Sequence, residues 1–293
     1  MNKTQVDLAC LGTCNIDFIS QVPLFASSEE EVNVKKLHIM MGGSAFNFTT
    51  RISSFGIKTG ILARVGKDYF GKLFLSKLKP LKIDISRLLV MDDNTGMAFI
   101  AVNDLAEKSI YSSSGANASF KLEKGDIEFI NNSKMLHLTG MYWEVADEAS
   151  KHAEKLSFNP GPVMSSLGIN KLRNTLRRTE ILFLNQKEVS LLTGMNWEEG
   201  SLSLLDLGIP MVVVTNGAEG ATLFTEEGAM FSPAKKVRAV DTTGAGDNFA
   251  AGFIKFYIEG KRHEDCLKHA NHIASICVQK IGGSFTGKLD FNP

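Results

Sequence analysis

The sequence has no excess of charge of either sign. Its 32 basic residues are matched by 32 acidic ones, so the formal net charge at pH 7 is zero. No basic cluster stands out along the 293 residues. Because nucleic acids and anionic membranes attract proteins through concentrated positive charge, we expect neither to be a principal partner.

Long apolar runs are also missing. The N-terminus, MNKTQVDLACLG, has no signal segment, and no stretch approaches the length of a membrane span. Only four cysteines occur, Cys10, Cys14, Cys266 and Cys277, without C-x-x-C spacing. These absences predict a cytoplasmic protein with free buried thiols, and they disfavour disulfides and a zinc site.

Two common nucleotide-binding motifs are absent. The first strand candidate is followed by GTCNID instead of G-x-G-x-x-G, which disfavours a Rossmann-type oxidoreductase. The string GGSFTGK at residues 282–288 has the spacing of a Walker A loop. Leu289 follows it where that loop needs Ser or Thr to hold magnesium, so we reject this motif.

The most informative stretch is VDTTGAGDNFAAG, residues 240–252. Gly244, Ala245 and Gly246 precede a helix expected over residues 248–259. The bare N–H groups at such a helix start bind anions, and phosphate is the obvious one. Asp247 could then accept a proton from an attacking hydroxyl. An Asp-capped helix after a glycine turn would use the same residues, so this stretch alone does not decide between the two.

Short apolar segments alternate with helical ones from residue 126 onward. This rhythm predicts an α/β fold with a mostly parallel sheet and helices on both faces. The expected strands are 135–138, 156–158, 181–184 and 211–215, after an earlier one at 6–11. The expected helices are 147–155, 169–177, 187–193 and 201–207, followed by a long one from Cys266 to Ile281.

Polar residues follow several of these strands. Asp17 comes soon after the first strand, and GGSAFN places Gly42, Gly43 and Asn47 at the start of a helix. Ligands of parallel sheets bind beyond the carboxyl ends of the strands, so these residues suit a hydroxylated small molecule. A turn aspartate and a helix-entry turn would look the same.

Residues 18–40 look irregular, with a strand candidate over 32–41. A separate strand pair, 95–102 and 109–113, lies outside the alternating pattern and could cover the site as a lid. We expect Met97, Phe99, Ala101 and Ile110 to give this lid an apolar roof.

Four motifs in a fixed order connect these observations. They are GGSAFN at 42–47, NQKE at 185–188, VTNGAEGA at 214–221 and DTTGAGDNFAAGF at 241–253. With them the chain closely resembles the ribokinase-like (PfkB) family of carbohydrate and nucleoside kinases, over nearly its whole length. The resemblance implies one three-layer α/β/α domain over residues 1–293, with lid strands from about 13–41 and 95–114. It also implies transfer of the γ-phosphate of ATP, with Mg²⁺, to a primary hydroxyl of a sugar or ribosyl group.

The resemblance assigns roles to matching positions of this chain. Asp247 would be the catalytic base, and Gly244, Ala245 and Gly246 would form the anion hole. The substrate hydroxyls would be held by Asp17, Gly42, Gly43 and Asn47. The nucleotide would be bound by Asn185, Thr215, Gly217, Gly220, Asn271 and Gly283. Glu188 would order Mg²⁺ through water, and Asp241 and Thr243 match a K⁺ site of some members.

The substrate is less well defined. LHLTGMYWE at 136–144 and FNPGP at 158–162 look most similar to archaeal-type nucleoside kinases, which favours a nucleoside. A ribokinase- or fructokinase-type simple sugar is the alternative. Tyr142 and Trp143 could stack on a base or pack internally. A non-catalytic sensor would keep the fold without needing Asp247. By analogy with family members, the lid strands could also form a homodimer.

Overall fold

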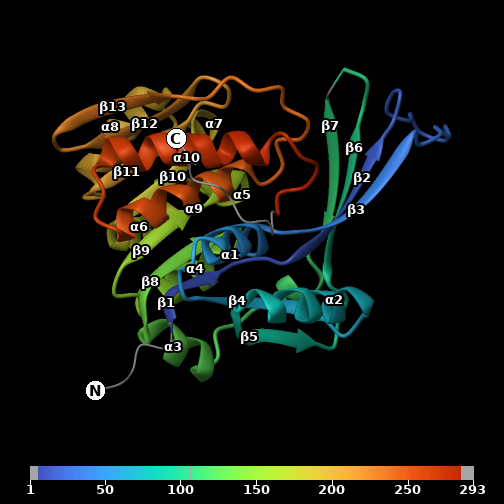
Figure 1. The fold of residues 1–293 in the computed structure, drawn as a ribbon, viewed down its shortest axis with the longest axis horizontal. Helices are drawn as coiled ribbons and strands as arrows, with labels where there is room; N and C mark the ends of the chain where they lie inside the picture. Colours follow the sequence, from blue (N-terminus) through green and yellow to red (C-terminus); the bar gives the residue numbers. More distant parts are fainter. Residues whose placement is uncertain (1–5, 106, 285–293) are drawn as a thin grey trace.

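The computed structural model describes residues 6–105 and 107–284. A nine-stranded sheet, in the order β13-β12-β11-β10-β9-β8-β1-β4-β5, forms the centre of the molecule (Figure 1). Its strands run parallel except β12 and β13, which pair antiparallel at one edge. They are β1 (Val6–Leu11), β4 (Thr59–Gly66), β5 (Asp84–Met91), β8 (Ser133–Thr139), β9 (Leu156–Asn159), β10 (Ile181–Asn185), β11 (Met211–Thr215), β12 (Gly220–Thr225) and β13 (Gly228–Pro233).

Helices cover both faces of this sheet, as the α/β rhythm predicted. On one face lie α1 (Ser44–Ser54), α2 (Tyr69–Leu78), α9 (Ala245–Ile258) and α10 (His263–Cys277). On the other lie α3 (Lys124–Asn131), α4 (Trp143–Ser150), α5 (Gly161–Ser165), α6 (Gly168–Arg178), α7 (Gln186–Thr193) and α8 (Trp197–Asp206). Two short 3₁₀ turns, Lys79–Leu81 and Gly115–Asn117, complete the helical elements in the described residues.

Two apolar cores result, one on each face of the sheet. Alternate residues of a strand point to opposite faces, so Leu8 and Cys10 enter one core while Ala9 and Leu11 enter the other. The three-layer α/β/α architecture is therefore confirmed. Among the described residues, none of the helices combines the length and the apolar character that crossing a bilayer requires.

A second, four-stranded sheet projects from the first (Figure 1). Its order is β3-β2-β6-β7, built from β2 (Asn15–Gln21), β3 (Lys36–Gly42), β6 (Gly96–Val102) and β7 (Lys108–Ser113). These strands come from the two segments expected to supply a lid. Part of the stretch 18–40 that looked irregular is thus strand, because β2 pairs with β3 and β6 along its whole length.

Other differences from the predicted elements have local causes. Strands β5 and β13 and helix α3 were not predicted. Helix α4 ends at Ser150, earlier than the predicted 155, because residues 151–155 form the turn into β9. Helix α10 ends at Cys277, because the Val278 carbonyl accepts hydrogen bonds from the N–H groups of Val240 and Asp241. The chain after α10 is thereby drawn toward the glycine turn that precedes α9.

Candidate active site

Helix α9 begins at the glycine turn with unpaired N–H groups. Gly244 is its N-cap, with φ of +70°, a conformation that favours glycine. The N–H groups of Gly246 and Asp247 have no hydrogen-bond partner among the described residues. A Cβ on Gly246 would meet no atom within 4 Å, so the turn faces open space. The positive end of the helix dipole and these free donors make a site for an anion such as a phosphoryl group.

The helix starts three residues before the predicted 248. Its first residues, Ala245 and Gly246, are small and carry no apolar signal that spacing could detect. The side chain of Asn248 fixes this start in place. It donates hydrogen bonds to the carbonyls of Gly244 (2.8 Å) and Gly283 (2.7 Å) and accepts one from Arg51 Nε (2.5 Å).

Gly283 lies directly against the glycine turn. A Cβ on Gly244 would come within 2.4 Å of the Cα of Gly283, so the two backbones touch. Gly283 also contacts Asn47, since a Cβ on Gly283 would lie 2.6 Å from Asn47 Nδ2. The resemblance assigned Gly283 to nucleotide binding, and in the structure it lies between the glycine turn and Asn47.

Asp247 lies in the first turn of α9 and is partly buried. Its Oδ2 accepts a hydrogen bond from Asn47 Nδ2 at 3.0 Å. Burial raises the pKa of Asp247 to about 7; the Asn47 hydrogen bond acts in the opposite direction, and the negative charges of Glu188 and Asp17 add to the rise. A carboxylate that titrates near neutral pH is well suited to take up a proton during a reaction.

Asp17, Gly42 and Asn47 come together beside Asp247. A Cβ on Gly42 would lie 2.2 Å from Asp17 Oδ2, so only glycine leaves room for that carboxylate. Burial, followed by the charge of Asp241, raises the pKa of Asp17 to about 6. Asn47 is 3% exposed, and its Oδ1 is buried without a hydrogen-bond partner among the described residues. A buried acceptor of this kind requires a donor, which a ligand hydroxyl would supply.

Gly43, assigned to the same group, has a structural position. It is the N-cap of α1 with φ of +88°, and a Cβ there would lie 2.4 Å from the carbonyl oxygen of Thr13. Only glycine therefore lets the chain turn from β3 into the helix that carries Asn47.

A cavity of about 480 Å³ opens on one side of the glycine turn. Four of the predicted nucleotide-binding residues line it: Thr215, Gly217, Gly220 and Asn271. Ala245 and Gly246 also line it, so the cavity reaches the anion site. Phe249 and Ser275 line it too and were not predicted, because nothing in the sequence separates them from core residues of their helices.

Asn185 and Glu188 form the capping box that starts α7. Asn185 Oδ1 accepts from the Glu188 N–H at 2.9 Å, and Glu188 Oε2 accepts from the Asn185 N–H at 3.0 Å. Neither residue lines the cavities described here. Glu188 is buried, which raises its pKa, and its charge acts on Asp247.

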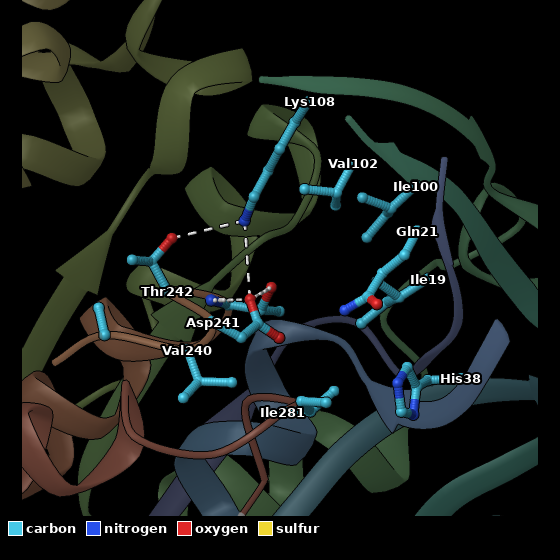
Figure 2. Close-up of a pocket in the computed structure, with 12 residues that line it drawn as sticks. Ile19, Gln21, His38, Ile100, Val102, Lys108, Val240, Asp241, Thr242 and Ile281 are labelled. Atoms are coloured by element: carbon cyan, nitrogen blue, oxygen red, sulfur yellow. Dashed lines mark hydrogen bonds and ion pairs between the residues drawn. The ribbon is translucent and has the colours of Figure 1, made fainter. Parts of the chain in front are cut away.

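A second cavity, of about 230 Å³, lies between the four-stranded sheet and residues 239–243 (Figure 2). It shares Ala239 and Thr242 with the larger cavity, so the same segment separates the two. Lys108 crosses this cavity from β7. Its Nζ lies 3.6 Å from Asp241 Oδ1 and 3.4 Å from Thr242 Oγ1.

The apolar surface of the four-stranded sheet that faces this cavity differs from the predicted roof. Ile100 and Val102 line it, whereas Phe99 stacks on Phe18 at a centroid distance of 5.1 Å on the opposite face. Met97 and Ala101 point to the same face as Phe99, away from the cavity, because successive side chains of a strand point to opposite faces. Ile110 pairs with Ile100 and so keeps its predicted side.

Asp241 and Thr243, suggested for K⁺, are bonded to each other. Asp241 Oδ1 accepts from the Thr243 hydroxyl (2.7 Å) and N–H (2.9 Å), and Oδ2 accepts from the Gly282 N–H (2.9 Å). Although burial alone would raise it, the pKa of Asp241 is lowered by these hydrogen bonds and by Lys108. The described residues contain no group of three or more His, Cys, Asp or Glu that could hold a metal ion. A K⁺ dependence stays a prediction.

Four polar residues of the smaller cavity were not predicted: Gln21, His38, Lys108 and Thr242. Gln21 follows Asp17 and Ile19 on the same face of β2, so recognising that strand would have found it. Tyr142 donates to Ser114 Oγ at 2.9 Å, and Trp143 packs under Lys171, with Nζ 3.7 Å from the ring centroid. Neither aromatic residue lines the two cavities.

Comparison with known proteins agrees with this geometry. The model of the pfkB family of carbohydrate kinases matches residues 5–288. A nucleoside kinase of Methanothermobacter thermautotrophicus is 27% identical over 281 residues, covering 94% of this chain and 90% of the relative. An ATP-dependent ribose-1-phosphate kinase of Halopiger xanaduensis is 28% identical over 277 residues, covering 92% and 91%.

The fold has a matching solved structure as well. Arabidopsis thaliana ribokinase, complexed with ribose and ATP, aligns with a TM-score of 0.84 at 26% identity, covering 94% of both chains. The family model covers nearly the whole chain, including the glycine turn, Asp247 and both cavities. The chain therefore belongs to the pfkB family of carbohydrate kinases, enzymes that phosphorylate hydroxyl groups of sugars and nucleosides.

Proposed function

We propose that this kinase transfers the γ-phosphate of ATP to the primary hydroxyl of a nucleoside, with Asp247 as general base. One observation carries the proposal. Asp247 and the unpaired N–H groups of the glycine turn lie where the larger cavity meets the Asp17–Asn47 group. ATP in the larger cavity would present its γ-phosphate to the turn, and an acceptor held by Asp17 and Asn47 would face it.

The residues divide the reaction between them. Asp247 would accept the proton of the acceptor hydroxyl as that oxygen attacks the phosphorus. Asn47 donates to Asp247 Oδ2 and so holds the carboxylate in one orientation. The N–H groups of Gly246 and Asp247 would stabilise the negative charge of the transferring group. A positioned base contributes about 10²–10⁴-fold to a rate.

Negative charge gathers around Asp247, although the described residues contain no group of three acidic side chains that could hold a metal ion directly. The negative charges of Glu188 and Asp17 act on Asp247, and burial raises the pKa of all three carboxyl groups. Such an excess of carboxylates is relieved by a cation that enters with the phosphates. We assign Glu188 to Mg²⁺, through water. Asn185, whose Oδ1 accepts from the Glu188 N–H, would hold Glu188 in place. When bound, Mg²⁺ would neutralise charge on the ATP phosphates.

The nucleoside is preferred because the acceptor side has room beyond a sugar. The smaller cavity of about 230 Å³ is lined by Ile19 and Gln21, which lie on the same face of β2 as Asp17, and several of its walls are apolar. The similarity to the nucleoside kinase of Methanothermobacter thermautotrophicus supports the same choice. A simple sugar such as ribose is the alternative, supported by the likeness to Arabidopsis thaliana ribokinase. A non-catalytic sensor would have no use for the Asp247 arrangement.

ADP release from ATP and Mg²⁺ tests the assignment. The acceptor panel would contain adenosine, inosine, guanosine, cytidine, uridine, ribose and fructose, with Asp247→Ala as control. We expect release with nucleosides and its loss in the control. Release with ribose or fructose alone would establish the alternative. ATP binding without release for any acceptor would support the sensor instead.

We further propose that the four-stranded sheet is a lid and that a second copy of this chain covers its outer face. One row crosses all four strands in register: Ile39, Phe18, Phe99 and Tyr111. Three of these are largely exposed, at 53% for Ile39, 48% for Phe99 and 72% for Tyr111. An exposed apolar sheet face of this kind can pack against the same face of a second copy, because a two-fold dimer uses the same surface on both subunits.

Light scattering after size-exclusion chromatography would test the dimer. We expect a dimer for the native chain and a monomer for Phe99→Asp. Val163→Asp is the matched control, because Val163 is also exposed but lies on α5, away from the lid. A native monomer at micromolar concentration would disprove this part of the proposal.

A further inference from the structure

Alternate residues of β2 point to its inner face and form a row that leads away from the reacting group. Asp17, Ile19 and Gln21 alternate along the strand, and the last two line the smaller cavity. At about 3.3 Å per residue, Ile19 lies roughly 7 Å and Gln21 roughly 13 Å beyond Asp17. Given the proposed function, with ribose held at Asp17, a base attached to it would lie at Ile19 with its far edge near Gln21.

The walls of this cavity suit a flat ring. Ile19, Ile100 and Val102 line it from the four-stranded sheet (Figure 2). Val240 and Ile281 line it from the large-sheet side. Apolar surfaces on two opposite sides favour a planar, neutral group over a charged or strongly hydrated one.

Two polar side chains at the far end can read the edge of that ring. The Lys108 ammonium has three N–H donors, of which Asp241 and Thr242 can take two. Figure 2 shows the Gln21 carboxamide directed into the space between the four-stranded sheet and Asp241. This carboxamide has no hydrogen-bond partner among the described residues, so it offers one acceptor and two donors.

A carboxamide is complementary to a lactam edge, the –NH–C(=O)– group of hypoxanthine, guanine and uracil. Its oxygen would accept from the ring N–H, and its NH₂ would donate to the ring carbonyl. The third N–H of Lys108 would donate to the same carbonyl. Adenine instead presents an amino group, whose hydrogens would face the ammonium, and cytosine lacks the ring N–H.

A phosphate substituent on the sugar fits this cavity less well. The similarity to a ribose-1-phosphate kinase raises that possibility. However, Lys108 is the one lysine or arginine among the described residues lining the cavity, and Asp241 already faces it at 3.6 Å. A phosphate there would meet the Asp241 carboxylate and the apolar walls, so the paired charge favours a neutral base.

We propose that Gln21 and Lys108 are specificity-determining residues that recognise the lactam edge of the nucleoside base. They are positioned by the lid, on strands β2 and β7, and do not contact the reacting atoms. The inference gives the enzyme a preference for inosine over adenosine and for uridine over cytidine. Each comparison changes the base edge and leaves the ribose unchanged.

Steady-state kinetics with these two matched pairs would test the proposal. For the native enzyme we expect kcat/KM at least about tenfold higher for the lactam member of each pair. Lys108→Met should lower kcat/KM for inosine by about 10- to 100-fold, mainly through KM, because a hydrogen bond to a charged group is lost. Adenosine should change little. Gln21→Met, of similar volume, should reduce the same preference and provides a second variant if one fails to fold.

Lys35→Met is the matched control. Lys35 is also a lysine of the four-stranded sheet region paired with an aspartate, Asp104, at 2.7 Å, but it does not line the cavity. It should leave the inosine preference unchanged. Inosine binding by calorimetry without ATP gives a readout independent of turnover. It should weaken in Lys108→Met and Gln21→Met but not in Lys35→Met.

The outcomes separate this inference from the proposed function. Equal kcat/KM for inosine and adenosine would overturn the recognition of the lactam edge while leaving a nucleoside kinase. An equal loss for all four nucleosides in Lys108→Met, seen in kcat, would show that Lys108 only supports the fold around Asp241. Phosphorylation of ribose but of no nucleoside would overturn both the nucleoside assignment and this inference.

Discussion

Replacing Asp247 by Asn should inactivate the enzyme and at the same time stabilise its fold. The proposed mechanism needs a carboxylate there, although the buried position disfavours its charge. Asn has almost the same shape and can still accept the hydrogen bond from Asn47. The substitution therefore removes the proton acceptor and removes the cost of burying the charge, and the two effects have opposite signs in separate measurements.

The pH dependence follows from the direction of the pKa change. Folding raises the pKa of Asp247 from 3.8 to about 7. The folded state therefore binds more protons than the unfolded state between these values, and native stability falls as pH rises from about 4 to about 7. Asn at this position does not titrate. The free energy of unfolding of Asp247→Asn should therefore equal that of the native chain below pH 4, exceed it increasingly from about pH 4 to about pH 7, and exceed it by a constant amount above that.

The magnitude has an upper limit. A pKa change from 3.8 to about 7 corresponds to at most about 4 kcal/mol, because each pKa unit is worth about 1.4 kcal/mol. Solvent reaches part of the Asp247 side chain, which reduces this cost. We expect the free energy of unfolding of Asp247→Asn to exceed that of the native chain by about 1–3 kcal/mol at pH 8.

Urea denaturation of both proteins at pH 5.5 and pH 8 would measure this difference. The gain should be smaller at pH 5.5. In parallel, kcat/KM of the native enzyme should rise with pH through about 7, since the base must be ionised, and Asp247→Asn should lose about 10²–10⁴-fold. Equal stability of the two proteins at pH 8, together with a flat pH–rate profile, would refute a buried base with a raised pKa.

Three further substitutions concern the glycine turn and the core. Gly246→Ala should keep or slightly raise stability, because Ala favours a helix and its Cβ meets no atom, while kcat should fall because the methyl group enters the space of the phosphate. Gly244→Ala should lower the free energy of unfolding by about 1–3 kcal/mol, because Gly244 has a φ of +70° and contacts Gly283. Both are checked by thermal unfolding and ADP release, and a stable, fully active Gly244→Ala would contradict the packing. Asp126→Asn should destabilise by about 3–5 kcal/mol, because Asp126 pairs with the buried Arg64 (2.6 Å) and with Arg87 (2.8 Å). Although burial alone would raise it, Arg87 and Arg64 lower the pKa of Asp126, so this stability should be lost as pH falls below 3.8, as acid titration of unfolding would show.

The parts of the fold that could be predicted are those with strong local signals. Strands β1 and β11 have the bounds expected from their apolar patterns. The glycine turn could be placed before α9 because two closely spaced glycines directly precede the helical apolar pattern. Asp17 and Asn47 could be placed near a ligand because ligands of parallel sheets bind beyond the carboxyl ends of the strands. Asp247 joined them only through the resemblance to the kinase family.

Other features depend on contacts that no local pattern contains. Ile100 and Phe99 are neighbours in sequence with similar polarity, and only the pairing of β6 with β2 decides which of them faces the cavity. Lys108 meets Thr242 across 134 positions of the chain, and it lies just outside the strand predicted at 109–113. Gly283 could be matched to a motif, but its contact with Gly244 depends on how the chain leaves α10.

The hydrogen bond between Asn47 and Asp247 also has a consequence for how the molecule is made. It joins residues 200 positions apart, and the nearby bond from Arg51 to Asn248 spans 197. Contacts between residues so far apart in sequence form slowly, because the entropy of closing a large loop is lost before the contacts contribute any stabilising energy. On the ribosome, Asp17 and Asn47 are synthesised well before Asp247, and α1, which carries Asn47, meets its packing partner α9 only near the end of synthesis. Phosphoryl transfer becomes possible only when the last fifth of the chain docks, so catalytic competence should appear as a late, single step in refolding.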